Sequence, residues 1–253
     1  MRRIVLCVAV VALGLVGVSA RAQEKPDRLA WIEHIKAKPG MEAQLEEGGK
    51  KHLAWHKKQG DTWSIYLWQV VLGDDAGNYV LGSFGHAWKD FDAREAFNAA
   101  DEKDATASVG PFLQSDTPSI WRVLDDFSRP NEQATAPPKF IQLTHYFVKP
   151  ASISAFTDAL KQIKGALDDA RFPVHTTWYA LASGGKGPHY VAATERGSWA
   201  EFAGPEKGMS KVLEEKLGAR KATELVDDVR EATTSFYSEV LLYRPDMSYM
   251  PAK

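Results

Sequence analysis

Two histidines one helical turn apart have the spacing best suited to chemistry in this sequence. His52 and His56 are four residues apart, with Trp55 between them. In a helix this spacing places both imidazoles on one face, where they could chelate Zn²⁺ or another metal ion that prefers nitrogen. The sequence offers no third ligand at a telling distance and no HExxH motif. We therefore expect hydrogen-bonded structural histidines here, with a metal site as the minor alternative.

A second pair of histidines belongs to an internal repeat. Residues 29–92 match residues 140–203 at a constant offset of 111, with no gap, so that His34 falls on His145 and Trp88 on Trp199. Such a repeat fixes the architecture and is examined before other patterns. The two matched histidines lie on the first predicted strand of each half. We expect them to share a structural hydrogen-bonding role, and together with Glu33 they are minor candidates for catalysis.

Alternation along these strands separates two faces. One face carries Trp31 and Glu33 and, in the second half, Tyr146; the other carries His34 and His145. The first face is more polar and aromatic, so we expect it to line a ligand cavity inside a barrel and the histidine face to pack on helices. If the faces are exchanged, the two histidines become the central site residues. The predicted ligand-binding residues are Trp31, Glu33, Tyr66, Trp68 and Tyr146.

The two copies differ most along their first helix. The second copy has an apolar stripe that includes Ile163 and Leu167, and His52 and His56 occupy the matching positions in the first copy. The pair Gly48-Gly49 is also unusual, because glycine is costly in the middle of a helix, and it predicts a close approach or a kink. Differences between the copies mark the first half as the place where a function could reside.

Each half predicts the same order of elements. In the first half, strands are expected at 29–37, 63–72, 79–84 and 119–124, with helices at about 40–58 and 88–107. In the second half, strands are expected at 140–148, 176–182, 190–194 and 235–243, with helices at about 152–169 and up to about 233. This order is the ferredoxin-like β-α-β-β-α-β motif, whose sheet has helices on one face only. Two such units can cover each other's open faces. We therefore predict an α+β fold in which two tandem ferredoxin-like units pack sheet to sheet as an intramolecular, pseudo-dimeric α+β barrel.

The N-terminal segment and the composition indicate where the protein is located and which partners it lacks. Residues 1–22 combine Arg2-Arg3, an apolar run and the small residues of a cleavage site, which predicts a secretory signal peptide. The only cysteine, Cys7, lies within it, so the mature chain would have no disulfide or thiolate. We expect a periplasmic or extracellular protein that is not held in a membrane after cleavage. The net charge of −2 before cleavage argues against a nucleic-acid partner.

The chain is then divided as follows. After the signal peptide, residues 23–127 form the first ferredoxin-like repeat, the Pro-rich segment 128–138 a linker, residues 139–245 the second repeat and residues 246–253 a tail. The text IKAKPGMEAQLEE, at the turn between the first strand and helix, resembles the dimeric α+β barrel superfamily, including the antibiotic-biosynthesis-monooxygenase and NIPSNAP types. That resemblance implies a barrel within one chain, and functions ranging from cofactor-independent monooxygenases and isomerases to haem enzymes.

These observations favour a protein that binds a small apolar or aromatic molecule in the barrel. The alternatives are a cofactor-independent monooxygenase or isomerase, in which a histidine or Glu33 removes a proton, and a structural module with a filled barrel. We expect no cofactor, with a metal or haem as minor possibilities. A small molecule is the expected partner, and the protein could be a monomer or a homodimer.

Overall fold

The first half of the chain forms a four-stranded sheet with helices on one side. The computed structural model describes residues 28–251, so the predicted signal peptide lies outside the described residues. The strands are β1 (Leu29–Ala37), β2 (Tyr66–Leu72), β3 (Tyr79–His86) and β4 (Leu113–Val123). The helices are α1 (Glu42–Gln59), α2 (Trp88–Ala93) and α3 (Glu95–Ser108), followed by the 3-10 turn η1 (Gly110–Phe112).

The second half repeats this arrangement. Its strands are β5 (Phe140–Val148), β6 (Thr176–Ser183), β7 (His189–Arg196) and β8 (Thr233–Tyr243). Its helices are α4 (Ile153–Asp169), α5 (Met209–Leu217) and α6 (Ala219–Ala232). The 3-10 turns η2 (Pro150–Ser152), η3 (Trp199–Ala203) and η4 (Pro245–Met247) complete the described elements. The predicted order of elements is therefore confirmed.

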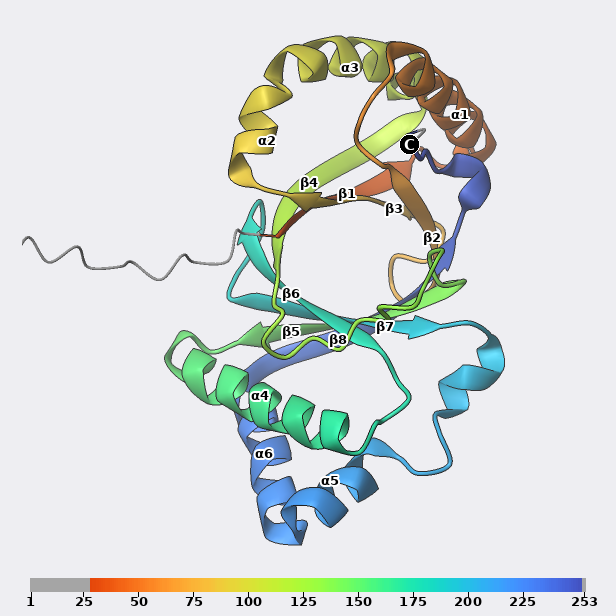
Figure 1. Ribbon diagram of the computed structural model, residues 1–253. Helices are drawn as coiled ribbons and strands as arrows, with labels where there is room; N and C mark the ends of the chain where they lie inside the picture. Colours follow the sequence, from red (N-terminus) through yellow and green to blue (C-terminus); the bar gives the residue numbers. More distant parts are fainter. Residues whose placement is uncertain (1–27, 252–253) are drawn as a thin grey trace, which may run out of the picture.

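The two sheets join edge to edge into one closed barrel. The strand order is β1-β3-β2-β8-β5-β7-β6-β4, and neighbouring strands are antiparallel. The seams between the halves are the β2–β8 pair, where Trp68 faces Tyr243, and the β4–β6 pair, where Arg122 faces Ala180. Helices α1 to α3 cover one side of the barrel and α4 to α6 the opposite side (Figure 1). The fold is thus the predicted intramolecular α+β barrel.

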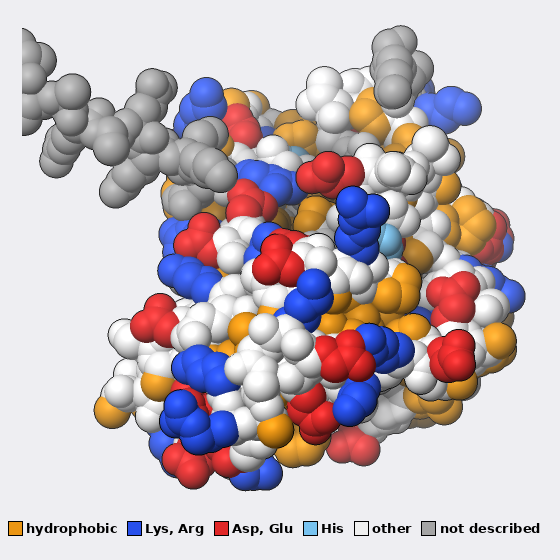
Figure 2. All heavy atoms as spheres, turned by 60° about the horizontal axis from the view of Figure 1, so that its bottom comes forward, with side chains coloured by type: hydrophobic (Ala, Val, Ile, Leu, Met, Phe, Trp, Pro, Cys, Tyr) orange, Lys and Arg blue, Asp and Glu red, His pale blue; other side chains and the backbone are white. Residues whose placement is uncertain are grey.

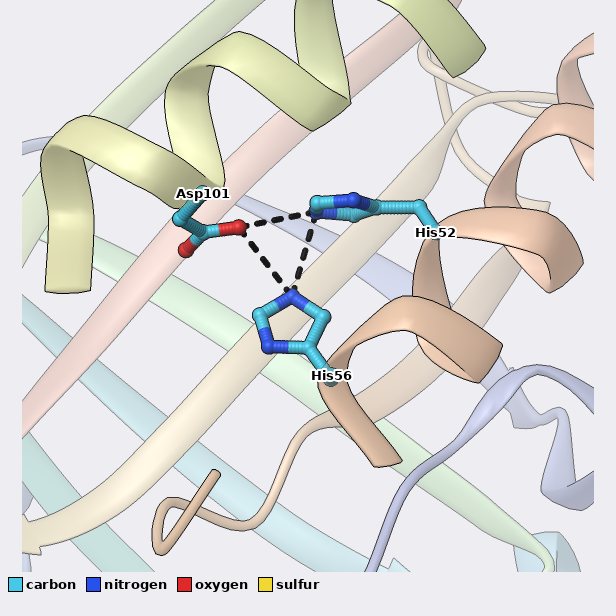
Figure 3. A group of neighbouring side chains, drawn as sticks. All are labelled: His52, His56 and Asp101. Carbon is cyan, nitrogen blue, oxygen red and sulfur yellow. Dashed lines mark hydrogen bonds and ion pairs between the residues drawn. The ribbon is translucent and has the colours of Figure 1, made fainter. Parts of the chain in front are cut away.

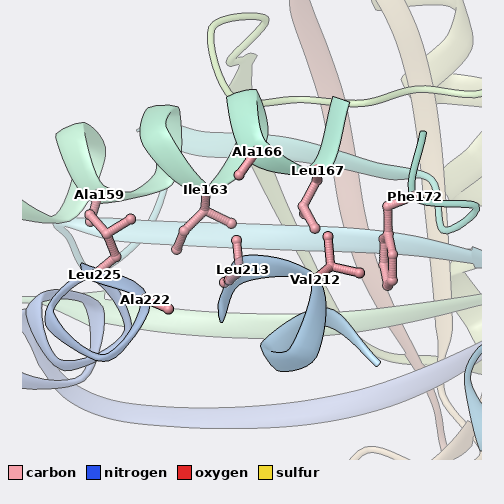
Figure 4. Packing of buried hydrophobic residues seen from close by; sticks show 9 residues of the cluster. All are labelled: Ala159, Ile163, Ala166, Leu167, Phe172, Val212, Leu213, Ala222 and Leu225. Carbon is pink, nitrogen blue, oxygen red and sulfur yellow. The ribbon is translucent and has the colours of Figure 1, made fainter. Parts of the chain in front are cut away.

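Apolar side chains from both halves pack inside the barrel. One cluster is centred on Trp68, Val70, Val80 and Leu241, and a second on Ala30, Trp121 and Val191. Outside the barrel, one cluster in each half joins the sheet to its helices. A further cluster packs α4, α5 and α6 against one another and includes Ile163, Leu167 and Leu213 (Figure 4). The helices are therefore held on the sheets by their own cores.

Some element ends differ from the prediction. The second strand begins at Tyr66 rather than at residue 63, because Asp61 accepts a hydrogen bond from the Trp63 backbone and shapes a turn there. The fourth strand begins at Leu113, six residues earlier than expected, because it pairs with the whole length of β1. No helix in residues 28–251 is long and apolar enough to cross a membrane.

Candidate functional sites

The matched histidines face the inside of the barrel. His34 pairs with Val80 across β1 and β3, and Val80 belongs to the interior cluster. His145 is buried and pairs with Val191, which also lies in the interior. The predicted assignment of faces is therefore wrong for β1 and β5. The assignment assumed that the more polar face lines a cavity, whereas in the first sheet the polar face is the one that faces the helices.

The residues predicted to line one cavity are divided among three places. Tyr66 and Trp68 do face the barrel interior, where their rings stack at 5.8 Å. Trp31 and Glu33 face the helices of the first half, and the Trp31 indole nitrogen donates to Glu33 Oε1 over 2.6 Å. Tyr146 faces α4 and packs on Phe156. Alternation was read correctly within each strand, but the side of the sheet was assigned wrongly for β1 and β5.

Three polar side chains form a chain inside the barrel. His145 Nδ1 lies 3.0 Å from His189 Nε2, and His145 Nε2 lies 3.2 Å from Glu239 Oε1. Burial, with His145 nearby, lowers the pKa of His189 to about 4, and burial also lowers the pKa of His34. Sequence reasoning missed His189 and Glu239, because only strand pairing brings β7 and β8 beside His145. Of the two matched histidines, His145 thus has the structural hydrogen bonds expected of it.

A polar cluster lies between α1 and α3. Figure 3 shows His52 and His56 of α1 pointing at Asp101 of α3. The two histidine Nε2 atoms are 3.1 Å apart, and Asp101 Oδ1 lies 3.1 Å from His52 Nε2 and 3.2 Å from His56 Nε2. Asp101 is the third group that the sequence did not reveal, because it lies on another helix 45 residues beyond His56.

Further carboxylates surround the histidine pair. His52 Nδ1 lies 2.8 Å from Asp104, and His56 Nδ1 lies 2.8 Å from Asp61. Asp61 is buried and also takes two hydrogen bonds from Arg94, at 2.5 and 2.7 Å. Burial would lower the pKa of His56, but Asp101 and Asp61 outweigh burial and raise that pKa to about 9. Without another cation, His56 would carry a proton at neutral pH.

Glu33 lies beside this cluster on the helix-facing side of β1. Burial, together with the nearby Asp116, raises its pKa to about 7, and the charges of Asp101 and His52 also act on it. A carboxyl group with this pKa is divided between its neutral and ionised forms near neutral pH. Glu33 is therefore a half-buried acid in the layer that holds the histidine pair.

The second half has an open cavity between its sheet and its helices. Its volume is about 1030 Å³, at the upper end of the range for small-molecule sites. Helix-facing side chains of β5, β6 and β7 form its floor, and residues of α4 and α6 form its walls. The apolar lining residues include Leu160, Ile163, Leu167, Phe172, Trp178, Ala192, Val226, Val229 and Phe236, and Tyr146 is among the polar ones.

One guanidinium in this cavity lacks strong partners. Arg196, at the end of β7, lines the cavity, and its Nε atom is buried without a hydrogen bond. Its other contacts are long, at 3.4 Å to the Glu195 carbonyl and to Gln142 Oε1. The other cations of the lining are paired: Arg129 and Lys164 with Asp168, and Arg230 with Asp227. Arg196 is therefore the cation best placed to receive an anionic group.

Comparisons with known proteins identify the fold. No family model and no curated protein matches the chain. Among solved structures, an anthrone oxidase-like protein matches with a TM-score of 0.59 and 14% identity, over 91% of this chain and 95% of that one. A mutant chlorite dismutase from Candidatus Nitrospira defluvii matches with a TM-score of 0.55 and 8% identity, over 87% and 92%. This chain has the dimeric α+β barrel fold. Because these sequence identities are so low, the structural similarity shows the fold but indicates no activity.

The comparisons also correct one prediction for this α+β barrel. We expected no cofactor and ranked haem as a minor possibility. The fold is shared with a mutant chlorite dismutase. This finding contradicts the low rank given to haem.

Proposed function

We propose that this α+β barrel protein binds a small apolar molecule that carries an anionic group, in the cavity of the second half. The observation that carries the proposal is the half-buried guanidinium of Arg196 in a large apolar cavity, whose Nε atom is buried without a hydrogen bond. A buried donor without a partner is costly, and a carboxylate would supply a bidentate, charge-assisted pair. Ligand sites typically combine an apolar lining with a few polar groups that fix orientation.

The outer surface of the second half agrees with this proposal. Figure 2 shows hydrophobic side chains exposed between Lys, Arg, Asp and Glu side chains on this face. Phe236 and Met209 line the cavity and are exposed to 72% and 43%. A partly apolar ligand would cover such side chains, and the charged rim would remain in water. The proposed site lies outside the barrel, whose interior is packed with side chains, and of the predicted ligand-binding residues it includes Tyr146.

Haem is one member of the proposed ligand class, as a flat apolar ring with two carboxylates. The apolar lining of the cavity suits the ring, and Arg196 suits a carboxylate. No histidine lines the cavity; among its lining residues, Tyr146 and Met209 have the side-chain types that can bind haem iron. When bound, haem would supply one-electron or oxygen chemistry. A visible absorption spectrum of the purified protein, and of the protein titrated with haemin, measures this directly.

The test of the proposed site uses 1-anilinonaphthalene-8-sulfonate, an apolar probe with one negative charge. Arg196→Gln should weaken its binding by about tenfold, because loss of a charge-assisted contact costs about 1.4 kcal/mol. Arg220→Gln, which removes an exposed arginine from α6, is the matched control and should leave binding unchanged. Fluorescence titration gives both affinities. Equal binding to the wild type and to Arg196→Gln would refute this site.

We also propose that the protein is exported. The support is the sequence of residues 1–22, with its basic start, apolar run and small residues before the cleavage point. Expression of the full chain in a bacterial host should yield a mature protein that begins at Gln23 and appears in the periplasmic or extracellular fraction. Intact-mass measurement gives the new N-terminus. A full-length protein found in the cytoplasm would contradict export.

A further inference from the structure

The same place in the two repeats holds opposite kinds of side chain. In the second half, Ile163, Leu167 and Phe172 are buried together with Val212 and Leu213 of α5 in one apolar cluster (Figure 4). At the offset of 111, the first three positions are His52, His56 and Asp61. In the first half, His52 and His56 meet Asp101 instead (Figure 3). His52 also contacts Asp104, and His56 contacts Asp61. An apolar core is thus sufficient for this fold, and the polar version needs a separate reason.

Stability does not supply that reason. Buried ionic groups lose hydration, and well-packed apolar residues of similar volume often give equal or greater stability. His56 and Asp61 are both nearly fully buried, at 2% and 3% exposure. The first half therefore has His52, His56 and Asp61 at positions where the second half has isoleucine, leucine and phenylalanine. Departures of this kind concentrate at functional sites.

The contacts fix how each imidazole is oriented. Each Nδ1 lies 2.8 Å from a carboxylate oxygen, that of Asp104 for His52 and that of Asp61 for His56. A carboxylate partner assigns the proton to Nδ1 and leaves Nε2 as the ligating nitrogen. Metal-binding histidines have this arrangement, with a carboxylate or carbonyl holding the second ring nitrogen. Both rings present Nε2 to the same point.

The atoms around that point need a proton or a metal cation among them, because their lone pairs otherwise repel one another. Two imidazole Nε2 atoms and Asp101 Oδ1 form a triangle with sides of 3.1, 3.1 and 3.2 Å. Asp101 Oδ1 is buried and has no hydrogen-bond partner. All three atoms can offer a lone pair. A proton on one nitrogen can join two of them, whereas a divalent cation can be bound by all three.

We infer that His52, His56 and Asp101 form a binding site for a divalent first-row transition metal ion. The corners of a triangle with these sides lie about 1.8 Å from its centre, so an ion at the usual ~2.0–2.2 Å from nitrogen and oxygen ligands fits just above its plane. Two histidines and one carboxylate suit Zn²⁺ or Fe²⁺. The carboxyl end of α1 and the middle of α3 supply the ligands, and Asp104 and Asp61 orient the imidazoles.

Three protein ligands leave part of the ion's coordination open. Structural zinc sites are closed by four protein ligands, whereas catalytic sites keep a position for water or substrate. The His52 and Asp101 side chains are 16% and 24% exposed, so solvent reaches this side of the cluster. Glu33, on the facing strand, is close enough for its charge to interact with both. The site therefore has the ligand count of a reactive metal centre, in the half opposite the proposed ligand cavity.

The test measures metal binding by the full mature chain, without an affinity tag and after treatment with EDTA. Calorimetric titration with Zn²⁺ should give one ion per chain, and Co²⁺ should produce a visible absorption band. His52→Gln and Asp101→Asn should each weaken Zn²⁺ binding by at least about 100-fold. Asp104→Asn, which affects only the orientation of His52, should weaken it by about 10- to 100-fold.

His175→Gln is the matched control, since it removes a half-buried histidine outside the cluster and should leave the affinity unchanged. Circular dichroism and the unfolding midpoint without metal check that each variant folds. If Asp101→Asn does not fold, His52→Gln decides, because His52 is partly exposed. Absence of one-to-one binding, or equal Zn²⁺ affinity in His52→Gln and the wild type, would overturn the inference and leave a shared proton at the centre of the cluster. The ligand cavity in the second half would be unaffected by either result.

Discussion

At the scale of single residues, the first half differs from its twin by buried charge. Glu33 stands where the second half has Thr144, at the offset of 111. Its carboxyl group receives a hydrogen bond from the Trp31 indole over 2.6 Å, yet burial and Asp116 raise its pKa to about 7. The ionised form of Glu33 is therefore unfavourable in the folded protein, and this gives a measurable dependence on pH.

Glu33→Gln should stabilise the protein at pH 8 and have little effect at pH 4.5. The folded pKa, about 7, lies above the ordinary value of 4.5, so wild-type stability is lost as the pH rises through this window. Glutamine keeps an oxygen for the Trp31 indole and cannot ionise. The free energy of unfolding in urea should rise by about 3 kcal/mol at pH 8.

Glu47→Gln is the control, because Glu47 is exposed on α1 and should show no such pH dependence. A gain for Glu33→Gln that was the same at every pH would contradict the assignment.

At the scale of elements, Gly48 determines how closely α1 and α3 approach. A Cβ at Gly48 would lie 2.2 Å from the backbone oxygen of Ser108 in α3, whereas one at Gly49 would meet only the flexible end of Met247 at 3.1 Å. The glycine pair in the sequence predicted a close approach or a kink, and the close approach is what the structure contains. This contact holds α3, and with it Asp101, near the histidines of α1.

Gly48→Ala and Gly49→Ala should therefore have effects of opposite sign. Gly48→Ala should lower the free energy of unfolding by about 1–2 kcal/mol, because the overlap with Ser108 forces α3 away. Gly49→Ala should raise it by a few tenths to about 1 kcal/mol, the helix preference of alanine. Urea unfolding at neutral pH measures both. Equal stability of the two variants would show that α3 is not held by this contact.

At the scale of the whole molecule, the repeat was the most informative part of the sequence. It predicted the element order and the barrel, because matched patterns imply matched units. It did not show which strand face lies inside, since Glu33 and Trp31 gave the helix-facing side of the first sheet the polar composition expected of a cavity. Nor could spacing reveal Asp101, which reaches His52 and His56 only when α3 packs on α1. The cavity around Arg196 likewise depends on side chains of α4, α6 and the sheet that come together only in the folded chain.

The seams β2–β8 and β4–β6 have a consequence for how such a protein can change over time. In a barrel assembled from two identical chains, every substitution appears twice, so both halves must tolerate it. Covalent joining of the halves removes that requirement. A duplicated gene can then keep an apolar core under one set of helices and place imidazoles and carboxylates under the other. The barrel between the two sets of helices supports both arrangements.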